Sequence, residues 1–111
     1  MSTAPGTSPG TGTGIDFAED VRLAPRWNVI LWNDDDHTYE YVIEMLRALF
    51  GFPPEKGFRH AKEVDTTGRT ILMTTSKEHA ELKRDQIHAY GADPRIARCK
   101  GSMSASIEPV D

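Results

Sequence analysis

The segment Trp27-Asn-Val-Ile-Leu-Trp-Asn-Asp-Asp-Asp-His-Thr38 decides the fold, because a strand pattern ends within it and a helical pattern begins directly after it. Its first half, Trp27 to Trp32, is short, alternating and rich in β-forming residues, which predicts a half-buried strand. From Tyr39 onward the apolar residues recur at helical spacing, and Gly51 suits the end of a helix. The acidic stretch Asn33 to Thr38 is therefore expected to be held between a strand and a helix.

The rest of the chain offers two more helices and two more strands. Asp36 or Thr38 is expected to cap the first helix, Pro54 to start the second and Ser76 to cap the third. The remaining predicted segments are a helix from Pro54 to about Asp65, a strand over Arg69–Thr75, a helix from Lys77 to about Tyr90, a basic surface loop over Ala92–Gly101 and a strand over Ser104–Ile107 that stops before Pro109.

The first helix is expected to bury one apolar stripe, formed by Tyr39, Val42, Ile43, Leu46, Leu49 and Phe50. The stripes on the second and third helices are thinner: Phe58, Ala61 and Val64, then Ala80, Ile87 and Tyr90.

The order β-α-α-β-α-β predicts an α/β protein, more closely an α+β two-layer sandwich, with a three-stranded antiparallel sheet packed against three helices. Which strand edges pair does not follow from the order. Residues 1–14 contain almost nothing but Gly, Thr, Ser, Pro and Ala, so residues 1–25 are expected to be a disordered extension and linker before a core domain of residues 26–111. A chain of 111 residues has room for one modest core.

Composition excludes several classes of function. The net charge of −4 argues against nonspecific nucleic-acid binding, which needs Lys and Arg to neutralise phosphates. No apolar run approaches ~20 residues, and the start of the chain lacks the order of a signal peptide, so no membrane partner is expected. The single cysteine, Cys99, forms no internal disulfide and suits a reducing compartment. These features predict a cytoplasmic monomer without a cofactor.

The acidic stretch admits four interpretations. The simplest is a turn and helix cap, which accounts for one or two of its residues. A metal site is the second, with ligands drawn from Asp34, Asp35, Asp36, His37, His60 and Asp65, although no established metal motif is present. Catalysis is the third, and it lacks support because Cys99 has no evident His partner in the sequence.

The fourth interpretation is recognition of an organic cation. An ammonium group carries three N–H donors, and it leaves water only if acceptors replace the lost hydrogen bonds. Asn33 and Asp34 supply two acceptors, and Asp65 near the end of the second helix could supply a third.

Four blocks of sequence resemble the ClpS family of adaptors. The first is Trp27-Asn-Val-Ile-Leu-Trp-Asn33-Asp34-Asp35, continued by Thr38 and Glu40 to Ile43; the others are Val64-Asp65-x-x-Gly68-Arg69, Glu78-x-Ala80-Glu81-x-Lys83, and Ser102-Met103-Ser-Ala-Ser-Ile107-Glu108-Pro109. Together they cover roughly Arg26 to Pro109 in the family's order.

The resemblance implies a noncatalytic adaptor that binds N-degron substrates, whose free first residue is Leu, Phe, Tyr or Trp, and delivers them to a ClpA- or ClpC-type AAA+ unfoldase. It implies that Asn33 and Asp34 bind the α-ammonium group. It places a hydrophobic pocket at His37, Thr38, Tyr39, Val42, Ala61, Val64 and Met103, and contacts with the unfoldase's N-terminal domain at Glu78 and Lys83. The alternatives are a peptide-binding module of the same fold without protease delivery, and an acidic metal-dependent hydrolase.

The chain departs from the family pattern at four positions. Asp65 stands where a His usually contacts the ammonium group, and it is expected to keep that role because a carboxylate is a stronger partner for a cation. Tyr39 replaces the Met that bars β-branched first residues, and Ala61 replaces another Met, so the preferred first residue is left open. Lys62 replaces a Leu.

Overall fold

The structure, a computed structural model, describes residues 25–97, 99 and 101–110. Its elements follow in the order β1 (Trp27–Trp32), α2 (Tyr39–Phe50), α3 (Pro54–Thr67), β2 (Arg69–Thr75), α4 (Lys77–His88) and β3 (Ala105–Pro109). The predicted α/β class, with three helices and a three-stranded antiparallel sheet in the described part of the chain, is confirmed. The expected disordered extension lies outside the described residues apart from residue 25, and every described helix is too short or too polar to span a bilayer.

The strand that precedes the acidic stretch forms the centre of the sheet. The strand order is β2-β1-β3, and β1 pairs antiparallel with both neighbours. Trp27 faces Thr75 on one side and Pro109 on the other, and the β1–β2 register shifts between Val29 and Ile30. Because β1 is held along both edges, the backbone that leads into the acidic stretch is fixed.

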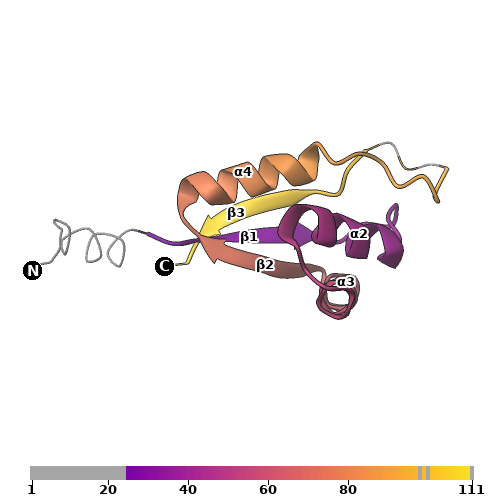
Figure 1. The fold of residues 1–111 in the computed structure, drawn as a ribbon, viewed down its shortest axis with the longest axis horizontal. Coiled ribbons are helices and arrows are strands. Elements are labelled where there is room, and N and C mark those ends of the chain that lie inside the picture. Colours follow the sequence, from indigo (N-terminus) through magenta and orange to yellow (C-terminus); the bar gives the residue numbers. More distant parts are fainter. Residues whose placement is uncertain (1–24, 98, 100, 111) are drawn as a thin grey trace, which may run out of the picture.

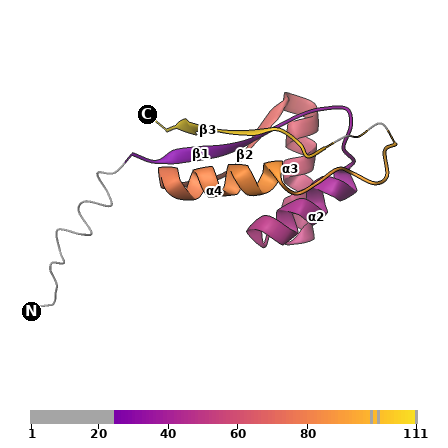
Figure 2. The ribbon, with the colours of Figure 1, turned by 90° about the horizontal axis from the view of Figure 1, so that it is seen from above.

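The helices and the sheet enclose the hydrophobic core between them (Figures 1 and 2). Helix α4 runs along β3 and β1, while α2 and α3 pack against each other near one end of the sheet. Val29 and Leu31 of β1 point into this core, where Met45 and Leu46 of α2 are fully buried. Full burial of one such side chain stabilises the fold by about 1.5–3 kcal/mol.

Local signals set the helix starts as expected. Thr38 caps α2: its backbone is extended and its hydroxyl accepts a hydrogen bond from the Tyr41 N–H at 3.1 Å. Pro54 occupies the first turn of α3, and the Ser76 hydroxyl accepts from the His79 N–H at the start of α4. Of the two residues considered as the cap of α2, Thr38 is therefore the one that serves.

Three predicted ends were wrong by a few residues. Helix α3 continues to Thr67 because Gly68, with a φ of 96°, closes it by donating its N–H to the Val64 carbonyl. Helix α4 stops at His88, before the expected Tyr90, whose ring lies edge-on against Tyr41. Strand β3 runs from Ala105 through Pro109, since an edge strand tolerates a residue without an N–H.

The predicted apolar stripes were partly wrong. In α2, Tyr41 and Met45 are buried although neither was in the expected stripe. In α3, Phe58 is 48% exposed, and Gly57 instead faces the core, where an added Cβ would lie 3.3 Å from the Ile43 Cα. Helices α2 and α3 therefore lie close together at Gly57, where an added side chain would require Ile43 to shift.

Candidate functional site

One small cavity has a mixed lining, apolar on one side and polar on the other, as the sequence predicted. Its volume is about 30 Å³. The residues that line it are Asn33, Asp34, His37, Thr38, Tyr39, Val42, Ala61, Val64, Asp65 and Met103. The structure thus brings together every residue expected at the ammonium site and the hydrophobic pocket.

Buried side chains form the apolar wall. Val42 comes from α2, Ala61 and Val64 from α3, and Met103 from the segment just before β3. All four are at most 3% exposed. Since three separate parts of the chain supply them, the wall exists only in the folded domain.

Asn33 lies on the polar rim, directly after β1. Its backbone N–H donates to the Gly68 carbonyl at 3.0 Å, which ties the end of β1 to the end of α3. Its side chain is not hydrogen bonded to any of the residues that the structure describes. The Asn33 amide is therefore positioned by its backbone and free to bind a ligand.

Asp34 is held in place by its neighbours. One of its carboxylate oxygens accepts the Asp36 N–H at 2.9 Å, and its two oxygens lie 2.7 and 2.9 Å from His37 Nδ1. This Asx turn accounts for the conformation of the acidic stretch. The Asp34 carboxylate is half-buried and already accepts these hydrogen bonds, so few of its lone pairs are left for a ligand. Its main contribution to the rim is therefore its negative charge.

His37 connects the acidic stretch to the loop before β3. Its side chain is 3% exposed, its Nε2 lies 2.8 Å from the Gly101 carbonyl oxygen, and its ring packs against Tyr41 at 4.5 Å between centroids. Cys99 Sγ lies 3.3 Å from the same Nε2. The sequence left Cys99 without a His partner; the fold places one beside it.

Asp65 and Tyr39 face each other across the cavity, one from α3 and one from α2. The Tyr39 hydroxyl donates to the Asp65 carboxylate at 2.7 Å, and this hydrogen bond raises the pKa of Tyr39 above its ordinary value. One carboxylate oxygen of Asp65 is thereby occupied, while the other forms no hydrogen bond with the described residues. Because α3 extends two residues past Asp65, this side chain projects from a helix rather than from a frayed end.

Asp93 is a structural residue of the site that the sequence did not reveal. It is 1% exposed, and its carboxylate accepts from the Thr38 N–H at 2.7 Å, the Thr38 hydroxyl at 2.8 Å and the Arg95 N–H at 2.9 Å. Burial acts to raise its pKa, but these hydrogen bonds outweigh burial and lower the pKa to about 2. The carboxylate thus caps α2 from 55 residues away in sequence.

The expected solvated loop over 92–101 was therefore only partly right. Arg95, which was expected to be a free surface charge, pairs with Glu44 at 2.7 Å and Asp93 at 3.3 Å. The two other basic residues of the loop, Arg98 and Lys100, lie outside the described residues. The sequence shows only an Asp followed by Pro and Arg, which indicates neither the burial of Asp93 nor its partner Thr38.

The two residues expected to contact an unfoldase lie apart from the cavity, on α4. Glu78 is exposed in the first turn of the helix. Lys83 is half-buried: its Nζ donates to the Leu49 carbonyl and lies 5.1 Å from the centre of the Phe50 ring. Lys83 therefore also binds an otherwise unpaired carbonyl at the end of α2.

The residues considered as metal ligands do not gather into one group. His60 lies on a different side of α3, where its Nδ1 is 2.8 Å from the Thr70 hydroxyl. Asp65 bonds to Tyr39, and Asp34 bonds to His37. Among the residues that the structure describes, no three His, Cys, Asp or Glu side chains are placed to hold a metal ion.

Comparison with known proteins identifies similar chains. Residues 22–95 match the family model described as ATP-dependent Clp protease adaptor protein ClpS. The chain is 30% identical over 90 residues to the ATP-dependent Clp protease adapter protein ClpS of Mycolicibacterium paratuberculosis, covering 80% of this chain and 85% of that one. It is 33% identical over 84 residues to the ClpS of Methylococcus capsulatus, covering 73% and 79%.

A solved structure shares the fold. Agrobacterium tumefaciens ClpS2, bound to L-phenylalaninamide, superimposes with a TM-score of 0.66 at 24% sequence identity, covering 77% of this chain and 96% of that one.

Proposed function

This chain belongs to the ClpS family of ATP-dependent Clp protease adaptors, and on that premise we propose that it binds the free α-ammonium group and large hydrophobic first residue of N-degron proteins and delivers them to a Clp AAA+ unfoldase. The family is one of adaptors and not of enzymes. The observation that carries the proposal is the single cavity that joins an apolar wall to a rim of acceptors. L-phenylalaninamide, the ligand of the Agrobacterium protein, has the same combination of free amino group and apolar side chain.

Discrimination rests on the charge of a true N-terminus. An internal residue presents a neutral amide with one N–H, whereas a free α-ammonium presents three donors. Asn33, Asp34 and Asp65 line the rim as acceptors. An acceptor that the bound peptide covers without pairing costs about 1–3 kcal/mol, so an internal residue is expected to bind more weakly. With an ordinary α-amino pKa of about 7.7–8.0, most N-termini are charged at neutral pH.

The pocket must widen to take a side chain. A volume of about 30 Å³ holds little more than one water molecule, far less than a leucine side chain. Tyr39 lines the cavity at a partly exposed position, with its hydroxyl bonded to Asp65 and its ring packed against Phe58, whereas Val42, Ala61 and Val64 are buried in the core. We infer that Tyr39 turns aside when an ammonium group competes for Asp65, which couples the charged rim to entry into the apolar pocket.

A binding screen over peptides that differ only in their first residue tests the proposal. Peptides beginning with Leu, Phe, Tyr or Trp are expected to bind, and those beginning with Gly, Asp or Lys are not. Acetylation removes the charge and two of the three donors, so each acetylated peptide should bind more than about tenfold more weakly. Fluorescence anisotropy gives both values. Equal affinity for the free and acetylated forms would refute the proposal, and peptides beginning with Ile and Val show whether Tyr39 bars β-branched residues.

Delivery requires contact with the unfoldase, for which we propose Glu78 and Lys83 on α4. The double variant Glu78→Ala with Lys83→Ala is expected to reduce capture of a ClpA- or ClpC-type N-terminal domain by about tenfold while leaving peptide affinity unchanged, because α4 lies apart from the cavity. Calorimetry with the isolated N-terminal domain measures this.

Lys83 also bonds to Leu49, so the single variant Glu78→Ala is needed to separate docking from stability. Asp85→Ala, also exposed on α4, serves as the matched control. A protein that binds peptides but captures no unfoldase in any form would be a peptide-binding module without delivery.

A further inference from the structure

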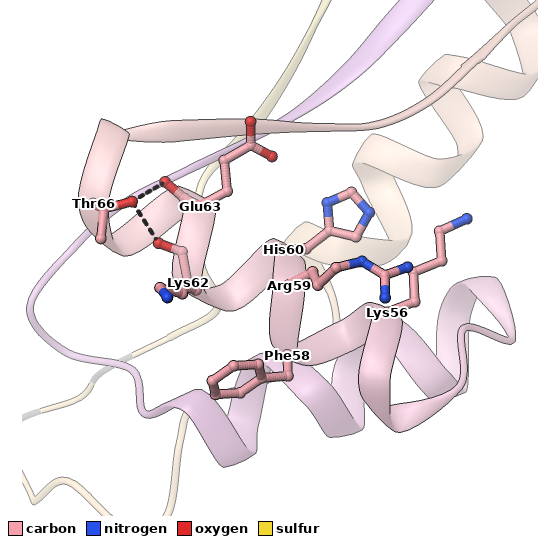
Figure 3. A pocket seen from close by; sticks show the side chains of 7 residues that line it. All are labelled: Lys56, Phe58, Arg59, His60, Lys62, Glu63 and Thr66. Carbon is pink, nitrogen blue, oxygen red and sulfur yellow. Dashed lines mark hydrogen bonds between the residues drawn. The ribbon is translucent and has the colours of Figure 1, made fainter.

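The outer side of α3 carries an open depression of about 600 Å³, much larger than the cavity described above (Figure 3). Three cations line it: Lys56, Arg59 and Lys62. Phe58, Glu63 and Thr66 also line the depression. The feature is thus a basic surface with one exposed aromatic ring on a chain whose net charge is −4.

The cations in the depression have no acidic partner within the described residues. None of the three forms a salt bridge there; Lys56 lies 4.0 Å from the centre of the Phe52 ring. Glu63 accepts a hydrogen bond from the Thr70 hydroxyl, and Asp65 on the same helix accepts one from Tyr39. These two carboxylates are therefore engaged, and Arg59 and Lys62 are exposed and form no ion pair with the described residues.

The depression adjoins the cavity. The Phe58 ring packs against Tyr39, 5.8 Å between centroids, so one aromatic pair separates the two. Helix α3 lines the cavity with Ala61 and Asp65 and the depression with Lys62 and Thr66, which alternate along the same turns. A peptide whose first side chain enters the cavity beside Tyr39 has this basic surface within reach of its next few residues.

We propose that the depression receives the residues that follow the first residue of a bound N-degron, and that Arg59 and Lys62 select acidic side chains there. This inference rests on the proposed function. An Arg fork binds a carboxylate in two hydrogen bonds, and Phe58 offers an apolar surface for the peptide backbone to lie against. The favoured occupant is an acidic peptide because the surface is short, contains Glu63 and belongs to an acidic protein, which suits a few carboxylates better than a nucleic-acid backbone.

The test uses two free N-terminal leucine peptides that differ at positions three to five, one with Glu and one with Gln. The full chain is expected to bind the Glu peptide about three- to tenfold more tightly at low salt, from two exposed ion pairs, and the ratio should approach one at about 1 M salt. The double variant Arg59→Glu with Lys62→Glu should reverse the preference without changing the affinity for the Gln peptide. The matched control, Lys77→Glu with Arg84→Glu on α4, changes the net charge equally and should keep the preference for the Glu peptide.

The outcomes separate this inference from the proposed function. An unchanged Glu-to-Gln ratio in the α3 variant would overturn the inference, and so would an equal loss for both peptides. Competition by an oligonucleotide as effective as the Glu peptide would overturn it too, since the surface would then bind any polyanion. If the Gln peptide binds no better than its acetylated form, the proposed function fails instead.

Discussion

The Asn33→Ala variant is expected to bind a peptide with a free N-terminal leucine about 10- to 100-fold more weakly than the wild-type protein. In the wild-type protein the Asn33 side chain has no partner among the described residues, while the Asn33 backbone N–H donates to the Gly68 carbonyl. Truncation of the side chain therefore removes a ligand acceptor and leaves the structural hydrogen bond in place. A hydrogen bond to a charged group contributes about 1.5–3 kcal/mol, which corresponds to that loss. Anisotropy gives the affinity, and thermal unfolding should show an unchanged midpoint.

Asn28, on the strand that directly precedes Asn33, provides a control. Its side-chain oxygen accepts from the Thr74 hydroxyl at 2.6 Å, away from the cavity. Asn28→Ala should leave peptide affinity unchanged. An Asn33→Ala protein that binds as tightly as the wild type would contradict the assignment of this amide to the ammonium group.

Substitution of Asp65 is expected to weaken peptide binding less than substitution of Asn33. Asp65 is exposed and shares its carboxylate with Tyr39, so Asp65→Ala is expected to weaken binding by about two- to fivefold. Tyr39→Phe removes the competing donor and should strengthen binding of the same peptide. Combining the two substitutions should abolish that gain, because the phenol acts through the carboxylate.

The second large effect is a loss of stability, which is expected when Asp93 is substituted. Asp93→Ala should lower the free energy of unfolding by about 3 kcal/mol and the midpoint temperature by about 15 °C. It leaves the Thr38 N–H at the start of α2 without its acceptor, and it leaves Arg95 without a buried partner. Urea unfolding measures the loss. Peptide affinity should fall only at temperatures where the variant unfolds.

The pH dependence of this effect has a definite sign. The pKa of Asp93 is about 2 in the folded protein against an ordinary value of 3.8. A carboxyl with a lowered pKa stabilises the fold fully above the unfolded value and loses that contribution as the pH falls through the folded value. The stability difference between the wild type and Asp93→Asn should therefore be constant above about pH 5 and shrink between about pH 4 and 2.

Glu44→Gln is the control for this substitution. It removes the other carboxylate that Arg95 contacts, at an exposed site, and should cost less than about 1 kcal/mol. If Glu44→Gln and Asp93→Ala destabilised the protein equally, the buried cap would not be the cause.

Local patterns predicted the elements well because their causes are local. The Thr38 and Ser76 hydroxyls and the glycine at position 51 act within a few residues, and each serves as expected. Trp27–Trp32 forms the predicted strand, but the expectation that it is half-buried was wrong, because Val29, Ile30 and Leu31 are all fully buried. The ends were less accurate where a contact from elsewhere intervenes. Tyr90, for example, leaves the helical pattern at a turn where its ring packs against Tyr41.

The candidate site divides in the same way. Its residue types were visible in the chain, and the resemblance to adaptors named nine of them, yet nothing in spacing alone could place Asp65 opposite Tyr39 or Met103 beside Val42. The role of Asp93 was not visible at all. A buried carboxylate is stable only where several donors converge on it, and these donors come from α2 and from its own loop.

The chain's local chemistry thus determined the strand, the acidic turn and the helix starts. The tertiary structure alone decided that β1 lies at the centre of the sheet, that α2 and α3 cross closely at Gly57, and that the pocket is small. The physical reason is range. Caps, turns and periodicity depend on neighbours in sequence, whereas burial, hydrogen bonds across helices and the volume of a cavity depend on which distant surfaces pack together.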